Sequence, residues 1–177
     1  MHSHVIIDSP VGPLTLVADD GALTALYLDT PSSDTRGRPG AEVLGPPGDP
    51  ADEPFAAAAD QLAAYFAGTL TEFSLPLEPA GTLFQRRVWA ELQAIPYGET
   101  RSYGELARAI GNPAAVRAVG LANGRNPIAV VIPCHRVIGS DGSLTGYGGG
   151  LDRKRYLLDL EAAGRPHSPA SSSRTAR

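Results

Sequence analysis

The chain of 177 residues contains a single cysteine, Cys134, and a histidine follows it directly. A lone cysteine in an intracellular chain is more often a small hydrophobic residue than a reactive one. Here Pro133 fixes the backbone before Cys134, and His135 and Arg136 would surround the thiol with polar, cationic groups that lower its pKa. The sequence therefore predicts a reactive thiol at Cys134.

A carboxylate near the end of the chain could complete this chemistry. Glu161 lies three residues after Leu158 in a helix predicted over residues 151–163, which places it on or beside the buried face. An unpaired buried charge is costly, so the carboxylate needs a partner, and His135 is the candidate. Cys134, His135 and Glu161 would then form a thiol, a base and an orienting acid. A structural Glu161, bonded to backbone amides or to an arginine, is the alternative.

The charge of the chain is unevenly distributed, although the net value is only −4. Residues 1–80 carry two cationic and twelve acidic side chains, which gives −10. Residues 81–177 carry thirteen cationic and seven acidic side chains, which gives +6. This split predicts that only the second half approaches a polyanion such as nucleic acid. Chance clustering on solvated helix faces is the alternative.

Length and composition indicate the broad class of the protein. A chain of 177 residues with 42% hydrophobic content fits one compact unit or two small domains that share an interface. A single cysteine allows no internal disulfide, and a functional free thiol is easiest to keep in a reducing compartment. The N-terminus lacks the features of a signal peptide, and no apolar run reaches about 18 residues. We therefore expect a cytoplasmic protein without a membrane segment.

The first half, residues 1–80, is expected to be a small α/β domain. Short strands are predicted at residues 5–7, 14–18 and 23–28, and Asp20-Gly21 is a strong hairpin signal. Residues 31–50 have the composition of a mobile surface loop. A helix over residues 53–67 is predicted from an apolar stripe and ends at Gly68; the stripe comprises Phe55, Ala59, Leu62 and Phe66. Leu75 and Leu77 fit an edge strand or an extended connection.

The second half, residues 81–165, is expected to be mostly helical. Thr82 with Gln85 and Ser102 with Glu105 are capping boxes that start two helices, which end at Pro96 and Gly111. The dipeptide Asn112-Pro113 is predicted to cap a further helix that continues to about residue 121. A strand at residues 128–132, a glycine-rich loop at 145–150 and the helix at 151–163 would follow, and residues 166–177 read as a disordered tail.

The helices on either side of Gly111 form a helix-turn-helix candidate. Its second helix presents Arg117 among small residues that would allow close approach to another surface, namely Ala114, Ala115, Ala118 and Gly120. Many helix pairs with such a turn never touch DNA, so this motif gains its weight from Arg117 and its neighbours.

Five segments, in this order, make the sequence resemble the O6-alkylguanine-DNA alkyltransferases, or methylated-DNA–protein-cysteine methyltransferases. They are residues 117–120, 126–127, 133–137 and 147–150, with Glu161 downstream, and the resemblance covers roughly residues 3–164. It implies an α+β fold. A small antiparallel, ribonuclease H-like sheet packed with a helix would be followed by a mostly helical domain with a helix-turn-helix of winged-helix type.

The resemblance also implies roles for the catalytic residues. Cys134 would accept the alkyl group, His135 would act as its base through a water molecule, and Glu161 would hold the imidazole. Asn126 would organise the site by hydrogen bonding. Tyr103 would donate toward guanine N3 and so help the purine to leave.

Further residues would bind the base and the duplex. Tyr147 and the amide of Gly148 would cover the base and bond its O6, while the carbonyls of Cys134 and Val137 would read its exocyclic amine. An extruded base needs a substitute in the stack, and Arg117 matches the arginine that fills this gap. Its helix resembles one that lies in the minor groove, with clearance from Ala115, Ala118 and Gly120.

The implied activity is a single-turnover transfer from O6-alkylguanine in double-stranded DNA, with O4-alkylthymine as a further candidate substrate. We expect a monomer without cofactor or metal, because His2 and His4 alone are not a site and no second cysteine exists. A non-catalytic binder of alkylated DNA is one alternative, although such relatives replace the cysteine. A transcriptional regulator would carry a metal-binding cysteine cluster, and a cysteine hydrolase would turn over repeatedly.

Overall fold

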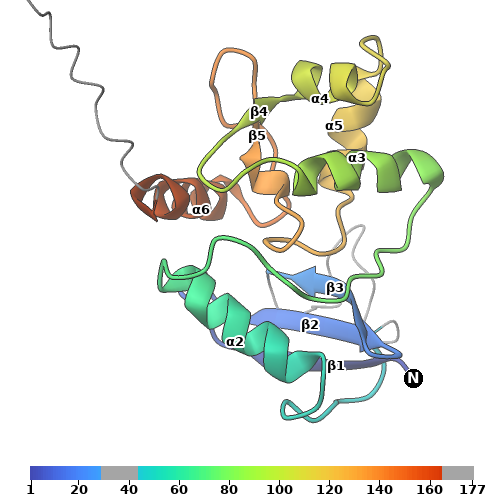
Figure 1. Cartoon of the computed structure of the whole chain (residues 1–177), viewed down its shortest axis with the longest axis vertical. Helices are drawn as coiled ribbons and strands as arrows, with labels where there is room; N and C mark the ends of the chain where they lie inside the picture. Colours follow the sequence, from blue (N-terminus) through green and yellow to red (C-terminus); the bar gives the residue numbers. More distant parts are fainter. Residues whose placement is uncertain (29–43, 165–177) are drawn as a thin grey trace, which may run out of the picture.

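A computed structural model describes residues 1–28 and 44–164 of the chain (Figure 1). A three-stranded antiparallel sheet with one helix across it forms one end of the molecule, and a group of helices forms the other (Figure 1). The α+β fold predicted from the sequence is therefore confirmed.

The sheet consists of β1 (Ser3–Ile7), β2 (Leu14–Asp19) and β3 (Ala22–Tyr27), in that order. Asp20 and Gly21 connect β2 to β3 with φ values of 47° and 84°. Two successive residues with positive φ form the tight hairpin turn that Asp-Gly favours, because its twist matches that of the strands. The hairpin predicted at this dipeptide is confirmed.

Part of the segment predicted as a mobile loop is bonded to the sheet. The amide of His4 donates to the carbonyl of Pro46 (3.1 Å), and the amide of Gly48 donates to the carbonyl of His4 (2.7 Å). Leu44 is buried against Val17 on one face of the sheet. Residues 44–48 of that segment are thus attached to the sheet end of the molecule. Residues 31–43 of that loop, and the tail at 166–177, lie outside the described residues.

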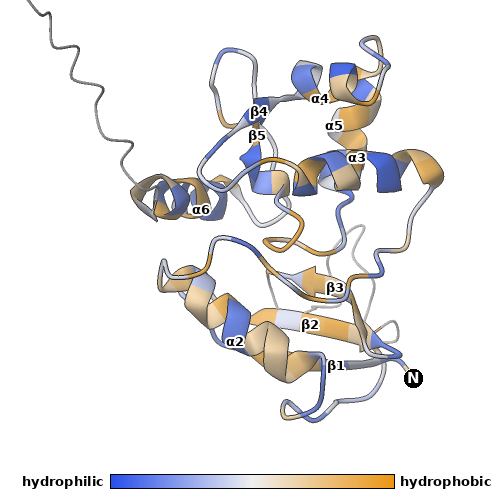
Figure 2. Ribbon diagram, viewed as in Figure 1, coloured by the Kyte–Doolittle hydropathy of each residue, from blue (hydrophilic) through white to orange (hydrophobic). Residues whose placement is uncertain are grey.

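Helix α2 (Phe55–Phe66) covers the other face of the sheet (Figures 1 and 2). Its buried residues are Phe55, Ala58, Leu62 and Tyr65. The predicted stripe had Ala59 and Phe66 in place of Ala58 and Tyr65, so it was shifted by one position over part of the helix. The shift places a tyrosine, with a polar hydroxyl, in the core.

The helical end contains α3 (Leu83–Gln93), α4 (Tyr103–Ala109), α5 (Val116–Gly124) and α6 (Leu151–Gly164). Both predicted capping boxes are present, at the starts of α3 and α4. The predicted start of α5 was wrong. Asn112 instead accepts the amide of Ala115 (3.0 Å) in a turn that precedes the helix, and the N-cap Ala115 offers no side-chain bond.

Two very short strands connect the start of α4 to the segment that carries the cysteine. Strand β4 (Arg101–Ser102) pairs in parallel with β5 (Val137–Ile138), which follows the 3-10 helix Cys134–Arg136. The strand predicted at residues 128–132 is absent: only Ile128 forms a bridge, to Leu26, and Val130 has a φ of 68°. The segment therefore turns just before the cysteine instead of running straight into it.

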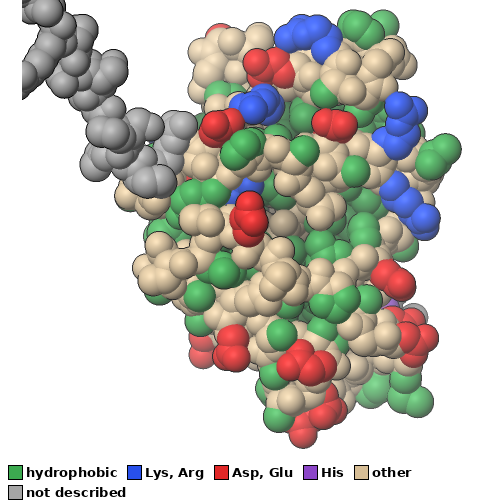
Figure 3. Space-filling model, viewed as in Figure 1, with side chains coloured by type: hydrophobic (Ala, Val, Ile, Leu, Met, Phe, Trp, Pro, Cys, Tyr) green, Lys and Arg blue, Asp and Glu red, His purple; other side chains and the backbone are tan. Residues whose placement is uncertain are grey.

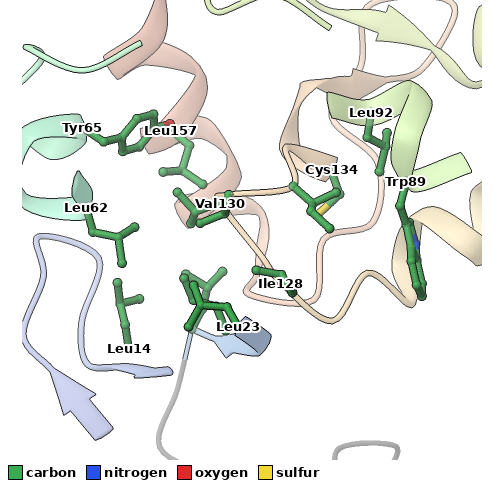
Figure 4. Close-up of a cluster of buried hydrophobic side chains, with 14 of the residues drawn as sticks. Leu14, Leu23, Leu62, Tyr65, Trp89, Leu92, Ile128, Val130, Cys134 and Leu157 are labelled. Carbon is green, nitrogen blue, oxygen red and sulfur yellow. The ribbon is translucent and has the colours of Figure 1, made fainter. Parts of the chain in front are cut away.

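One continuous core connects the two ends of the molecule (Figure 4). Leu14, Leu23 and Leu62 belong to the sheet end, while Ile128, Trp89 and Leu157 belong to the helical end of the same cluster (Figure 4). Because this core is shared, the sheet end can support groups in the helical end. Within residues 1–28 and 44–164, no helix is long and apolar enough to cross a membrane.

Candidate active site

Cys134 opens the 3-10 helix and lies in the wall of a cavity of about 550 Å³ between the two ends of the molecule. Its side chain is buried, and its residue is 7% exposed. The cavity is bounded by the end of β3, the end of α5 and the glycine-rich loop, through residues 26–28, 123–127 and 146–149. A small group that enters this cavity can reach the sulfur.

His135 and Glu161 form the predicted pair. His135 Nε2 lies 2.7 Å from Glu161 Oε1, and the two residues are 0% and 1% exposed. Burial raises the pKa of Glu161, but hydrogen bonds and charges from His135 and Arg136 outweigh this effect and hold the pKa at about 2. Glu161 is therefore an ionised acceptor, and His135 must present Nε2–H to it.

The proton on Nε2 leaves Nδ1 of His135 as the free acceptor of the ring. Burial lowers the pKa of His135, against the opposing effect of Glu161, so the imidazole is neutral. Nδ1 is buried and has no hydrogen-bond partner among the described residues. A neutral imidazole with an available Nδ1 and an anion on Nε2 is the arrangement of a general base.

Arg136 does not serve the thiol as the sequence suggested. Its guanidinium bonds both oxygens of Glu161, at 2.8 Å from Nε and 2.9 Å from Nη2, and donates to the carbonyl of Ile95. Burial raises the pKa of Cys134 and exceeds the lowering contributed by Asn126 and Lys154. The predicted net lowering was wrong, because the His135 ring is neutral and Arg136 bonds Glu161; of these two residues only His135 lowers the thiol pKa, through a backbone hydrogen bond. The resting thiol needs a base.

Asn126 closes the turn that carries the cysteine. Its Nδ2 donates to the carbonyl of Ile132 (2.7 Å), and its Oδ1 accepts the amide of Ile128 (3.0 Å). A side-chain hydrogen bond from Asn126 also lowers the pKa of Cys134. The predicted organising residue thus lies at the site, with its amide oriented by two backbone groups.

A buried lysine near the thiol was missed by the sequence reasoning. Lys154 of α6 is 0% exposed, and its Nζ donates to the carbonyls of Val137 (2.6 Å) and Thr145 (2.8 Å). Lys154, Leu157 and Glu161 are the buried residues of α6, at positions i, i+3 and i+7. The spacing of Lys154 from Leu157 and Glu161 on one face of the helix was the signal, because a buried charge needs partners.

Replacing Lys154 with methionine is expected to raise the pKa of Cys134, because the cation that favours the thiolate is lost. Alkylation of the cysteine by iodoacetamide at neutral pH should slow roughly three- to tenfold. The measurement is the pH dependence of this reaction, with thermal unfolding recorded alongside. Arg155→Met removes an exposed cation from the same helix and should leave the profile unchanged. An unchanged profile for Lys154→Met would contradict the assignment.

A second cavity, of about 480 Å³, adjoins the first. Tyr103, Gly120 and Thr145 line it, together with residues common to both cavities, namely Asn123, Gly124, Gly146, Tyr147 and Gly148. Thr145 Oγ1 donates to the hydroxyl of Tyr103 (3.1 Å). Strand β4 ends where the helix of Tyr103 begins, so its pairing with β5 helps to position Tyr103 relative to the cysteine segment.

Of the three residues predicted to form the base pocket, two line the cavities and one does not. Tyr147 and Gly148 line both cavities, and the buried hydroxyl of Tyr147 has no hydrogen-bond partner among the described residues. Val137 is not among the residues that line these two cavities, and its carbonyl accepts from Lys154. The structure therefore groups Tyr147, Gly148 and Tyr103 around the second cavity.

Arg117 lies on the exposed face of α5, whose Val116 and Gly120 line the second cavity. Val116 and Leu121 on the same helix are large apolar residues that are 41% and 64% exposed. Ala118 is exposed, and Ala115 and Gly120 are half-buried; a Cβ on Gly120 would lie 3.7 Å from the ring of Tyr103. In the view of Figure 3, the cationic side chains lie over the helical end, whereas acidic side chains lie at both ends.

Comparisons with known proteins identify the family of this chain. Residues 3–79 match the model of the 6-O-methylguanine DNA methyltransferase ribonuclease-like domain, and residues 83–163 match the DNA-binding domain of the same family. A methylated-DNA–protein-cysteine methyltransferase of Mycolicibacterium paratuberculosis is 58% identical over 93% of both chains. One from Methanosarcina acetivorans is 50% identical over 90% of this chain and 98% of its own.

A solved structure extends the comparison to the fold. The crystal structure of Mycobacterium tuberculosis OGT in complex with DNA is 55% identical, covers 93% of this chain and 96% of its own, and has a TM-score of 0.81. Together the two family models match most of the chain, and the identity of the relatives extends over nearly all of it. The chain therefore belongs to the 6-O-methylguanine DNA methyltransferase family.

Proposed function

We propose that the protein repairs alkylated DNA by moving the alkyl group from guanine O6 to Cys134. The sulfur attacks the alkyl carbon, a C–S bond forms and the bond from carbon to O6 breaks. The thiol proton passes through water to Nδ1 of His135, and the departing purine takes up a proton in return. The observation that carries the proposal is a cavity-wall thiol beside a neutral imidazole held by an ionised Glu161.

The two adjoining cavities support a place for the base. Tyr147 and the amide of Gly148 would cover the purine and bond its O6, and the hydroxyl of Tyr103 would donate to N3. The carbonyls of Cys134 and Val137 would accept from the exocyclic amine. A carbonyl has two lone pairs, so the bond from Lys154 leaves one at Val137, whereas at Cys134 the amine would replace the long contact from Asn123 Nδ2 (3.5 Å). Asn126 would keep the cysteine turn in place.

Helix α5 would bring the protein to double-stranded DNA through the minor groove. A stacked base cannot present its O6-alkyl carbon to a protein sulfur, so it must be extruded at a cost of a few kcal/mol. The exposed Arg117 would fill the space that the base leaves. The small side chains of Ala115, Ala118 and Gly120 would allow the helix to lie close to the groove.

A thioether is not reversed by hydrolysis, so each molecule would act once. We further propose that the protein acts as a monomer and that it works in the cytoplasm, where a free thiol stays reduced until it reacts. No cofactor is needed for the displacement, because the cysteine is both nucleophile and final acceptor.

The test is a count of repaired bases per protein molecule. With excess duplex that contains one O6-methylguanine, we expect restoration of about one guanine per protein and no second round. Cys134→Ser should restore none. Repeated turnover would instead indicate a hydrolase-like reaction, and tight binding without any restored guanine would indicate a damage-binding protein. Either result would reject the proposal.

A further inference from the structure

The Glu161 carboxylate receives one hydrogen bond from the sheet end of the molecule. Its Oε1 accepts from His135 Nε2 (2.7 Å), from Arg136 Nη2 (2.9 Å) and from the hydroxyl of Tyr65 (2.7 Å), while Oε2 accepts from Arg136 Nε (2.8 Å). His135 and Arg136 follow the cysteine directly. Tyr65 belongs to helix α2, 96 residues before Glu161 in sequence.

Tyr65 is held rigidly enough to position the carboxylate. The residue is 1% exposed, and its ring packs against those of Phe66 (5.3 Å between centroids), Phe73 (5.3 Å) and Tyr97 (6.3 Å). Burial and the neighbouring Glu161 raise its pKa far above the ordinary value, so the hydroxyl keeps its proton and can only donate to the carboxylate. Such a donor is fixed before any substrate binds.

We propose that Tyr65 is a positioning residue for alkyl transfer: the sheet end uses its hydroxyl to hold the carboxylate that orients His135. The inference rests on the proposed function, since it assigns Tyr65 to the same reaction. Tyr65 and His135 share one oxygen of Glu161, so the hydroxyl fixes this oxygen in front of the imidazole and takes up part of its negative charge.

The shared oxygen predicts a specific change when the hydroxyl is removed. With one donor fewer, Glu161 holds more charge toward His135 and stabilises its protonated form more strongly. His135 would then lose its proton at a higher pH. Arg136 and Lys154 also act on His135, Arg136 and Tyr97 act on Tyr65, and Tyr147 interacts with Glu161; all of these groups, and Cys134 beside His135, stay in place in a Tyr65→Phe variant.

The test compares Tyr65→Phe with wild type in single-turnover reactions from acidic to mildly alkaline pH. At neutral pH the rate should fall about fivefold, on duplex O6-methylguanine and on free O6-benzylguanine alike, because the effect is on the base and not on DNA. In the plot of rate against pH, the acidic limb should move to higher pH by about half a unit. In a Glu161→Gln background, Tyr65→Phe should change nothing further.

Tyr97→Phe is the matched control. The Tyr97 ring contacts Tyr65 and lies 5.8 Å from the Arg136 guanidinium, but its hydroxyl has no hydrogen-bond partner among the described residues. The Tyr97→Phe substitution should therefore leave the acidic limb of the pH–rate profile unchanged. An unshifted limb in Tyr65→Phe, or independent losses in the Glu161→Gln background, would overturn the inference.

A measurement that does not depend on alkyl transfer can test the role of Tyr65 separately from the proposed function. The ring of His135 can be titrated by NMR in the unreacted protein, and its protonation should move to higher pH in Tyr65→Phe. If wild type accepted no alkyl group, the proposed function would fail, while this titration would still decide whether Tyr65 acts on His135. An identical titration in both proteins would reject the role of Tyr65.

Discussion

Glu161→Gln should slow alkyl transfer to Cys134 by at least about a hundredfold, because the general base loses its orienting anion. The neutral amide can stabilise neither the imidazolium that forms at His135 nor the guanidinium of Arg136. Both partners are buried and bond the same carboxylate. Removing one partner of a buried ion pair also costs about 3–5 kcal/mol of folding stability.

The measurement pairs single-turnover kinetics with urea unfolding, so that lost reactivity is not confused with lost folding. Asp159→Asn removes an exposed carboxylate from the same helix and should preserve both the rate and the stability. If a folded Glu161→Gln variant reacted within a few-fold of wild type, His135 would not depend on Glu161 and the proposed general base would be wrong.

Arg117→Ala should reduce repair of duplex DNA by roughly tenfold or more while leaving the reaction with free O6-benzylguanine nearly unchanged. Extrusion of a base costs a few kcal/mol, and only the duplex requires it. Arg117 lies on the exposed face of α5, whereas the Cys134, His135 and Glu161 side chains are buried, so its removal leaves the reacting groups intact.

The ratio of the two rates is the quantity to compare, because general losses of affinity or folding affect it less. Arg108→Ala, an exposed cation on the neighbouring helix α4, controls for the charge alone. It should weaken duplex binding modestly and in a salt-dependent manner, without a selective loss of base extrusion. Equal losses on both substrates for Arg117→Ala would rule out the stack-filling role.

Local patterns in the sequence were good predictors where the physics is local. The capping boxes at Thr82 and Ser102 and the Asp20-Gly21 turn depend on residues within a few positions of each other, and all three are present. The pairing of His135 with Glu161 followed from the cost of burying an unpaired carboxylate. Both readings of Glu161 hold, since it bonds the histidine and an arginine.

Contacts between distant segments could not be predicted in this way. The direction of the Arg136 side chain depends on Ile95 and Glu161, and no spacing along the chain indicates it. The predicted buried stripe contained Phe66 in place of Tyr65, because a one-position shift along an alanine-rich helix changes the hydrophobicity of the stripe little. Strands as short as β4 and β5 carry no periodic signal at all.

The thiol environment shows how sequence neighbours can mislead. His135 and Arg136 are adjacent to Cys134 in the chain, yet the cation that lowers its pKa is Lys154 of α6. Burial dominates, so the thiol at rest is less acidic than an ordinary cysteine. Its reactivity then depends on His135, on Glu161 and, through Glu161, on the sheet end of the molecule.

The most direct test of the account is the mass of the intact protein after incubation with a duplex that carries one O6-methylguanine. We predict a gain of one methyl group in place of a proton, about 14 Da, found by peptide mapping on Cys134. Cys134→Ser should show no gain. Repaired DNA beside an unmodified Cys134, or a methyl group on any other residue, would contradict transfer to this cysteine.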